Sequence, residues 1–271
     1  MFYYNNLCDG RYIEPYAGGS GVALSLLLEG YAREVVINDV DPVIFAFWWA
    51  VLNDTEALCC RIQDTPVDVK TWHKQKEIHA KMDQYSWTDI GFATFFLNRT
   101  NRSGIIQGGI IGGYDQSGPF KIDARFNKKD LINRIRLIAG YSGRIMLYNL
   151  DAYNLIEALL PSMPQKVLVY FDPPYFKKGK SLYKNFYTRG DHARMASYIG
   201  ALECPWMVTY DNTPEIKELY KGNHQVEFDI SYSAHSTRPR GKEIMFYHNI
   251  ELPVLPYTRK NEILRNTIFT N

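Results

Sequence analysis

The sequence has little that would indicate metal, disulfide or membrane chemistry. Its cysteines, Cys8, Cys59, Cys60 and Cys204, show no C-x-x-C spacing, so neither a zinc site nor a disulfide scaffold is predicted. The six histidines are scattered without ligand spacing, which disfavours both a metal centre and His-based nucleophilic catalysis. No secretory signal opens the chain, and the apolar stretch Val22 to Leu28 is too short to cross a bilayer. We therefore expect a cytoplasmic protein without a membrane partner.

An excess of charge of either sign is also missing. The chain carries 31 Lys and Arg against 29 Asp and Glu, a formal net charge of +2. A nucleic-acid partner would therefore have to be bound by local basic clusters and not by bulk charge. With 271 residues and 46% apolar content, the chain is long enough to bury a full core, as one domain plus a smaller inserted one.

The most informative motif is Asp172-Pro173-Pro174-Tyr175, which directly follows the apolar run Val167–Phe171. The run predicts a buried strand, and ligands of open α/β sheets bind beyond the carboxyl ends of such strands. Two successive prolines fix φ and remove two N–H donors, so the carbonyls of Asp172 and Pro173 are left as acceptors. With the ring of Tyr175, these acceptors predict a site for a planar amine. The alternative is an ordinary turn at the end of a strand.

A second motif lies between a predicted strand and a predicted helix: Glu14-Pro15-Tyr16-Ala17-Gly18-Gly19-Ser20-Gly21. Glycines allow a ligand to approach the backbone closely, and the first turn of a helix offers free N–H groups. The next strand, Glu34–Asn38, leads to Asp39, where a carboxylate can hold the hydroxyl pair of a ribose. Because no phosphate-binding G-x-x-x-x-G-K-[ST] motif is present, an adenosine ligand without phosphates is predicted.

The order of predicted elements indicates an α/β domain with an insert. Strands and helices alternate up to Asn53, stop alternating between residues 54 and 140, and resume beyond. We therefore predict a catalytic domain from residues 1–53 and 141–250, a mainly helical insert at 54–140 and a C-terminal arm at 251–271. Alternating residues at 226–232 and 243–249 predict a closing hairpin.

Basic and amide side chains gather in the predicted insert and before the last strand. Arg and Asn are the usual readers of base edges. The candidates for DNA contact are Asn98, Arg99, Asn101, Arg102, Ser103, Arg125, Arg238, Arg240 and Lys242. The last three lie in the stretch of residues 238–242, which contains no acid, and are expected to contact phosphate, the alternative being a plain exposed turn. For Arg125 and the cations that follow it, a solvated helix face is the alternative.

These motifs, in this order along the chain, resemble the Dam-type DNA adenine N6 methyltransferases from about Arg11 to Asn249. The resemblance implies a Rossmann-like class I methyltransferase sheet of seven strands, with the insert as target-recognition domain. It also implies S-adenosylmethionine as cofactor and double-stranded DNA as partner, and suggests partner proteins of a modification or defence system. Carried over by position, it assigns the cofactor to Glu14, Pro15, Tyr16, Ala17, Gly18, Gly19, Asp39, Asp151 and Ala152.

One departure from the family lies ahead of the glycine-rich turn. Related proteins carry a Gly-Gly-Lys-like segment there, which helps to bind the methionine end of the cofactor. Residues Met1 to Leu7 contain nothing similar. Two expectations follow: either residues of the working protein are missing from this chain, or it binds the cofactor weakly or with help.

The resemblance and the acceptor turn together predict a mechanism. An adenine amine is a poor nucleophile because its lone pair is delocalised into the ring. Asp172 and Pro173 would each accept one N–H, which frees the lone pair to attack the methyl group. Tyr175 would stack on a base flipped out of the duplex. Two alternatives remain open: the same turn could act on an amine in RNA or in a protein glutamine, or the chain could be a DNA-binding subunit with weak or lost methyl transfer.

Overall fold

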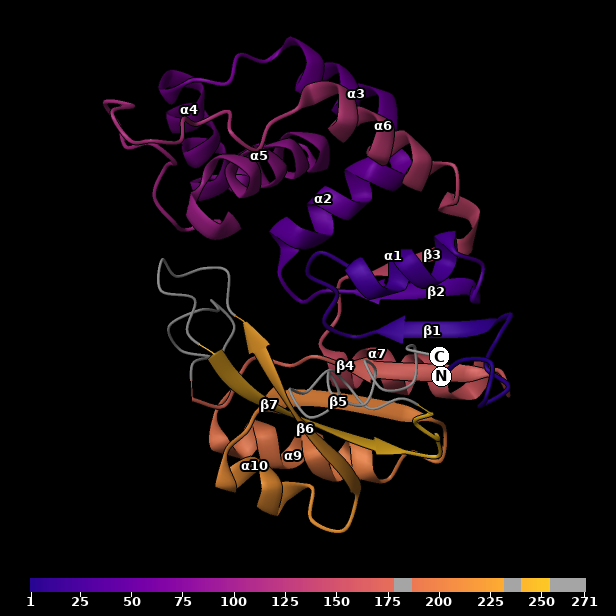
Figure 1. The fold of residues 1–271 in the computed structure, drawn as a ribbon. Coiled ribbons are helices and arrows are strands. Elements are labelled where there is room, and N and C mark those ends of the chain that lie inside the picture. Colours follow the sequence, from indigo (N-terminus) through magenta and orange to yellow (C-terminus); the bar gives the residue numbers. More distant parts are fainter. Residues whose placement is uncertain (178–186, 232–239, 254–271) are drawn as a thin grey trace, which may run out of the picture. The chain divides into compact units, whose positions relative to one another are not determined.

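The computed structural model describes residues 1–177, 187–231 and 240–253. Contacts divide the chain into two compact units (Figure 1). The first contains Met1–Val40 and Leu150–Asn271, and the second contains Asp41–Asn149.

A seven-stranded sheet has the order β3-β2-β1-β4-β5-β7-β6. The strands are β1 Gly10–Glu14, β2 Ala32–Asn38, β3 Ile145–Tyr148, β4 Val167–Phe171, β5 Trp206–Asp211, β6 His224–Ser231 and β7 Arg240–His248. Strand β1 pairs in parallel with β2 and β4, and β4 pairs in parallel with β5. Strand β7 runs antiparallel to both β5 and β6, which confirms the predicted hairpin. This mixed, largely parallel sheet confirms the predicted Rossmann-like fold class.

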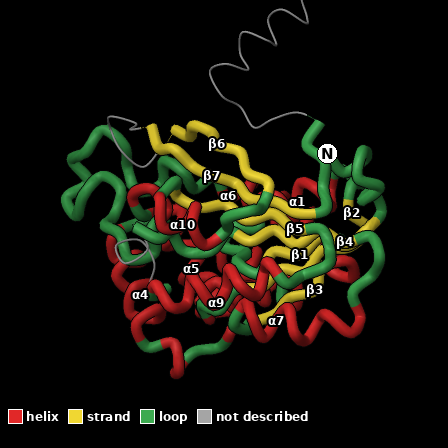
Figure 2. The backbone as a smooth tube through the Cα atoms, turned by 90° about the horizontal axis from the view of Figure 1, so that it is seen from below, coloured by secondary structure: helices red, strands yellow, loops and turns green. Residues whose placement is uncertain are grey.

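The described helices of the first unit are, with one exception, preceded by a residue whose side chain caps a free backbone N–H group. They are α1 Gly21–Leu28, α7 Ala152–Leu159, α9 Arg189–Gly200 and α10 Pro214–Leu219, with a 3-10 turn at Leu160–Ser162. Helix α9 starts with a capping box, in which Thr188 and Asp191 each bind the other's backbone N–H. Helices α7 and α9 lie side by side (Figure 2), with the ring centroids of Tyr153 and Tyr198 4.3 Å apart. The largest fully buried side chains of this unit include Trp206, Tyr12 and Tyr210.

The second unit is helical apart from β3. Its helices are α2 Pro42–Asn53, α3 Thr55–Asp64, α4 Val69–Ala80, α5 Trp87–Thr100 and α6 Lys128–Ala139, with 3-10 turns at Met82–Gln84, Arg102–Gly104 and Ser142–Arg144. Helix α2 packs on α5, so the unit extends beyond the predicted insert of residues 54–140 at both ends. Strand β3 was not predicted from the sequence, because four residues show no clear periodicity.

Among the described residues, no single helix is long and apolar enough to cross a membrane. Helices α2 and α3 meet the length and composition requirement only together, across a bend of 106°.

The packing of α5 on α2 depends on Gly91. A Cβ atom at this position would lie 2.6 Å from the carbonyl oxygen of Ala46 and 3.0 Å from Cβ of Ala50, both in α2. Such distances require the helix backbones to move apart, because a carbonyl oxygen cannot rotate away as a side chain can.

We predict that Gly91→Ala destabilises the protein by about 1–3 kcal/mol, the usual cost of overpacking. The control is Gly143→Ala, since a Cβ atom there would meet no atom within 4 Å. Urea unfolding of both variants and the unsubstituted chain gives the comparison. Equal unfolding midpoints for Gly91→Ala and Gly143→Ala would show that the close approach of the two helices is unimportant.

Candidate active site

The candidate site lies where the order of the sheet reverses. Strands β1 and β4 are neighbours, with Ile13 opposite Val169, and β2 and β5 lie on their outer sides. Ligands of doubly wound sheets bind beyond the carboxyl ends of the strands at this switch point. The glycine-rich turn follows β1 there, and Asp172 follows β4. The structure therefore brings the two principal sequence motifs together at one edge.

The glycine-rich turn is bound to the end of β2. The Ala17 N–H donates to the Asn38 carbonyl at 2.7 Å, and the Gly18 N–H donates to Asp39 Oδ2 at 2.9 Å. Gly18 has a φ of 47°, in the left-handed region that favours glycine. A Cβ atom at Gly18 or Gly19 would meet no atom within 4 Å, so the backbone has open space in front of it. This turn can accept a ligand at close range.

Asn38 joins the loops on both sides of this turn. Its buried amide donates to the carbonyls of Pro15 and Leu150, both at 2.9 Å, and its Oδ1 accepts from the Leu150 N–H at 2.9 Å. One side chain therefore joins the loops at Pro15 and Leu150. Asn38 was not among the predicted site residues, although a polar residue at the end of an apolar strand was a usable signal.

Glu14 is a buried carboxyl group beside the turn. Its Oε1 accepts from the Tyr12 hydroxyl and from the Ala23 N–H, both at 3.1 Å, so it also caps the first turn of α1. Burial raises the pKa of Glu14 to about 7, against the opposing effect of these two hydrogen bonds. Its Oε2 is buried and has no partner among the described residues. A buried acceptor of this kind is expected to bind a donor, and a ligand at the turn would supply one.

Asp151 and Ala152 begin helix α7. Asp151 Oδ1 accepts from the Tyr153 N–H at 2.9 Å as the N-cap of the helix, and Ala152 is buried. A cavity of about 450 Å³ opens beside this helix start, lined by Asp151, Tyr153, Asn154 and Arg194. The structure thus adds polar neighbours to the two residues expected from the sequence.

The acceptor turn after β4 is oriented by β5. The Thr209 hydroxyl donates to Asp172 Oδ1 at 3.0 Å, while Oδ2 makes no hydrogen bond to any described residue. Desolvation raises the pKa of Asp172, and the hydrogen bond from Thr209 opposes this shift. The Asp172 residue is nevertheless exposed, whereas Pro173 is buried. One carboxylate oxygen is held in place, and the other makes no hydrogen bond to a described residue.

Two further acids hold the chain directly after the prolines. Asp211 in β5 accepts from the Phe176 N–H at 2.8 Å and from the Lys177 N–H at 3.0 Å. Glu243 in β7 accepts from the Tyr175 hydroxyl. Asp211 and Glu243 lie opposite each other in the β5–β7 pair, so two neighbouring strands hold the turn together.

Tyr16 contacts Tyr187, which lies just before helix α9. Its hydroxyl is 2.7 Å from the Tyr187 hydroxyl, and the two rings pack edge to face. Burial raises the pKa of Tyr187 to about 12 and holds that of Tyr16 well above its ordinary value. Both phenols are therefore neutral donors at physiological pH.

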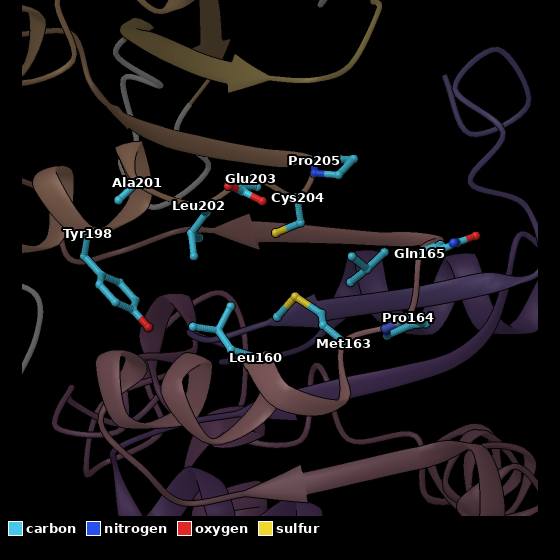
Figure 3. Close-up of a pocket in the computed structure, with 11 residues that line it drawn as sticks. Leu160, Met163, Pro164, Gln165, Tyr198, Ala201, Leu202, Glu203, Cys204 and Pro205 are labelled. Carbon is cyan, nitrogen blue, oxygen red and sulfur yellow. The ribbon is translucent and has the colours of Figure 1, made fainter.

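A larger cavity, of about 600 Å³, lies elsewhere on the same unit (Figure 3). It is lined by Leu160, Met163, Pro164, Gln165, Val167, Tyr198, Ala201, Leu202, Glu203, Cys204 and Pro205. Val167 begins β4 and Pro205 precedes β5, so the cavity lies at the opposite ends of these strands from Asp172. It is not part of the candidate active site.

In the second unit, Asn101 holds a loop together. It is fully buried; its Oδ1 accepts from Trp72 Nε1 at 2.6 Å, and its amide donates to the carbonyls of Ile105 and Ile106 at 2.9 and 2.8 Å. These bonds use the amide donors and occupy the acceptor. The side chain therefore presents no exposed group that would reach a base, contrary to what its residue type suggested.

Arg99 and Arg125 are also engaged within this loop. The Arg99 guanidinium donates to the Arg125 carbonyl, and the Arg125 guanidinium donates to the carbonyls of Asn98 and Asn101. Burial lowers the pKa of both arginines. Both guanidinium groups therefore donate hydrogen bonds to carbonyls of the loop, and only the part of each that stays exposed is available to DNA.

The remaining candidates are more accessible. Arg102, Ser103 and Asn98 are exposed, and Lys242 is exposed on β7. Arg238 lies outside the described residues, and of Arg240 only the backbone is described, at the start of β7. Within the described residues, no group of three or more His, Cys, Asp or Glu is arranged to hold a metal.

Solved structures match this chain only weakly. An uncharacterized protein from Listeria monocytogenes matches 94% of this chain and 67% of its own, with a TM-score of 0.37 and 6% identity. A SAM-dependent methyltransferase from Agrobacterium tumefaciens matches 90% of this chain and 59% of its own, with a TM-score of 0.36 and 10% identity. The fold assignment therefore depends on the strand order itself.

Sequence relatives are more informative. The type II methyltransferase M.CviBI of Paramecium bursaria Chlorella virus NC1A is 24% identical over 249 residues, 88% of this chain and 87% of the relative. The type II methyltransferase M.MjaIII of Methanocaldococcus jannaschii is 24% identical over 209 residues, 71% of this chain and 70% of the relative. The sequence model of the D12 class N6 adenine-specific DNA methyltransferases matches residues 5–235, which include both motifs at the switch point. The chain therefore belongs to the D12 class of N6 adenine-specific DNA methyltransferases.

Proposed function

We propose that Asp172, Pro173 and Tyr175 form the amine site with which this adenine-specific DNA methyltransferase acts on a flipped base. The observation that carries the proposal is the state of Asp172: Oδ1 is held by Thr209, and Oδ2 makes no hydrogen bond to the described residues. Oδ2 and the Pro173 carbonyl are the two acceptors for the N6 hydrogens. The ring of Tyr175, fixed through its hydroxyl by Glu243, supplies the stacking surface.

These acceptors act on the nitrogen and not on the methyl group. Accepting both N–H groups biases N6 toward a pyramidal geometry and frees its lone pair for in-line attack. The bound cofactor would supply the methyl group, whose bond to sulfur would break as the N–C bond forms, with the sulfur keeping the electron pair. The product ammonium then loses one proton. No strong base is needed, which agrees with a carboxylate that acts as an oriented acceptor.

We propose that S-adenosylmethionine is bound by the loops at the ends of β1, β2 and β3. Asp39 would hold the ribose hydroxyls, Asp151 with Ala152 would border the adenine, and Glu14 Oε2 would accept a hydrogen bond from the methionine end. The open face of Gly18 and Gly19 and the unpartnered Glu14 Oε2 support this fit. Pro15, Tyr16 and Ala17 would shape the turn. When bound, this cofactor supplies the methyl group on a positively charged sulfur.

For DNA recognition, we propose that Arg102, Ser103 and Asn98 read bases, since all three are exposed polar residues. Asn101, Arg99 and Arg125 would serve mainly to hold that loop in shape. Lys242, with Arg238 and Arg240, would contact phosphate. Partner proteins of a modification or defence system remain a further expectation.

Asp172→Asn is expected to reduce single-turnover methyl transfer to duplex DNA by at least about 100-fold, because a preorganised acceptor acting in the transition state is lost. Binding of DNA and the unfolding midpoint should stay unchanged. Asp9→Asn is a matched control, since it makes the same change at an exposed position with a φ of 59°, which asparagine tolerates. Near-normal methyl transfer by Asp172→Asn would refute the assignment.

Asp39→Ala is expected to weaken S-adenosylmethionine binding by roughly 10- to 100-fold, the value of a hydrogen bond to a charged group. Asp39→Asn should lose less, because its side-chain oxygen can still accept from the Gly18 N–H. Calorimetric titration of both variants measures the difference. A dissociation constant unchanged in Asp39→Ala would count against the ribose role.

Substitutions in the two proposed groups of DNA contacts should have different effects on DNA binding. Arg102→Ala is expected to relax preference at one base pair by about 1–3 kcal/mol, whereas Lys242→Ala should weaken all duplexes alike and lower the salt slope by about one. Both variants would be titrated with a duplex that the unsubstituted chain methylates and with a scrambled duplex, each over a salt series. The proposed division is wrong if Arg102→Ala weakens both duplexes equally while Lys242→Ala changes sequence preference.

A further inference from the structure

We propose that Tyr170 and Thr209 form a hydrogen-bond relay that positions Asp172, so that two residues outside the Asp-Pro-Pro-Tyr motif orient the amine acceptor. The Tyr170 and Thr209 hydroxyl oxygens are 2.8 Å apart, and Thr209 donates to Asp172 Oδ1 at 3.0 Å. This inference rests on the proposed role of Asp172 as the acceptor.

The direction of the relay follows from the number of available protons. A threonine hydroxyl has one proton and can accept two hydrogen bonds. Because Thr209 gives its proton to the carboxylate, Tyr170 must donate to Thr209. A hydroxyl that accepts a hydrogen bond becomes a better donor, so Tyr170 strengthens the bond from Thr209 to Asp172.

The sheet places these three side chains together. Tyr170 lies in β4 and Asp172 directly follows this strand. Because they are two residues apart, their side chains lie on the same face of the sheet. Strand β5 pairs with β4 through Phe171 and Val208, so Thr209 follows directly beside Asp172. Thr209 is only 6% exposed, and its rotamer is restricted by β-branching. A rigid donor thus holds one oxygen of Asp172 and leaves the other toward the substrate side.

Other titratable groups face Asp172 and must be separated from the relay. Tyr12 and Glu14 interact with it from β1, and Tyr170 interacts with it along β4. Glu243 on β7 acts on Tyr170. Glu14, with a pKa of about 7, titrates in the physiological range, so it contributes to any pH profile. Its contribution is common to variants that differ only at Thr209.

The test compares Thr209→Val, which removes the donor at nearly constant volume, with Thr209→Ser, which keeps it. Single-turnover methyl transfer would be measured against pH with saturating S-adenosylmethionine and duplex DNA. Activity requires ionised Asp172, so it is lost as pH falls through the pKa of that group. Without the Thr209 donor this pKa rises, and the acid limb of Thr209→Val should move up by roughly one pH unit.

Thr209→Ser should keep the acid limb of the unsubstituted chain, and Tyr170→Phe should shift it in the same direction as Thr209→Val by a smaller amount. KM values for both substrates and the unfolding midpoints should remain close to those of the unsubstituted chain. A merely structural role for Thr209 would lower activity equally at every pH and leave the limb in place. Superimposed pH profiles for Thr209→Val and Thr209→Ser would overturn the relay.

Asp172→Asn, measured alongside, distinguishes a failure of the proposed acceptor role of Asp172 from a failure of the relay. If it retains methyl transfer, the proposed acceptor role fails and the relay fails with it. If it is inactive while Thr209→Val keeps the unsubstituted profile, the acceptor role stands and only the relay is refuted.

Discussion

The parallel pairing of β1 with β4 is the constraint on which the site depends. It makes neighbours of two strands that lie more than 150 residues apart in sequence, with Arg11 opposite Val167. Because the strands are parallel, the turn after Glu14 and the turn at Asp172 emerge at the same edge. The ladder cannot continue past Pro173 and Pro174, which lack N–H donors. Sheet topology and local chemistry thus place a glycine-rich turn beside an acceptor turn.

Buried polar groups stabilise this edge by binding one another. Asn38, Thr209 and Asp211 each satisfy partners in loops that leave other strands. A buried polar group without such partners costs free energy, so each of these contacts restricts the loops to one arrangement. Glu14 Oε2 and Asp172 Oδ2, both at the switch point, make no hydrogen bond to a described residue. We propose that these two oxygens serve a methyl donor and an amine substrate.

Much of the fold could be predicted because its signals are local. The apolar run of β4, the alternation of β6 and β7, and the start of α2 after Asp41 depend on neighbouring residues. Strand β3 could not be predicted, since it has only four residues and forms by pairing with β2 at the edge of the sheet. The second unit also begins earlier than predicted, because α2 packs on α5, a contact between distant segments.

The residues of the site likewise differ in whether they could be predicted from local sequence. The residues of the two motifs could be named from their spacing, but Asn38 and Thr209 acquire their roles only through strand order. Residue type misled at Asn101: an asparagine next to arginines suggested base reading, yet Trp72, 29 residues upstream, donates to it in a buried contact. Partners that distant are set by tertiary packing and leave no pattern near the residue itself.

Nucleoside mass spectrometry of duplex DNA treated with the purified chain and S-adenosylmethionine tests the central claim most directly, because it needs no knowledge of the target sequence. The account predicts N6-methyladenine as the methylated base, formed in duplex DNA and absent without the cofactor. Methylation confined to the N4 amine of cytosine, or none at all by a folded chain that binds the cofactor, would contradict it.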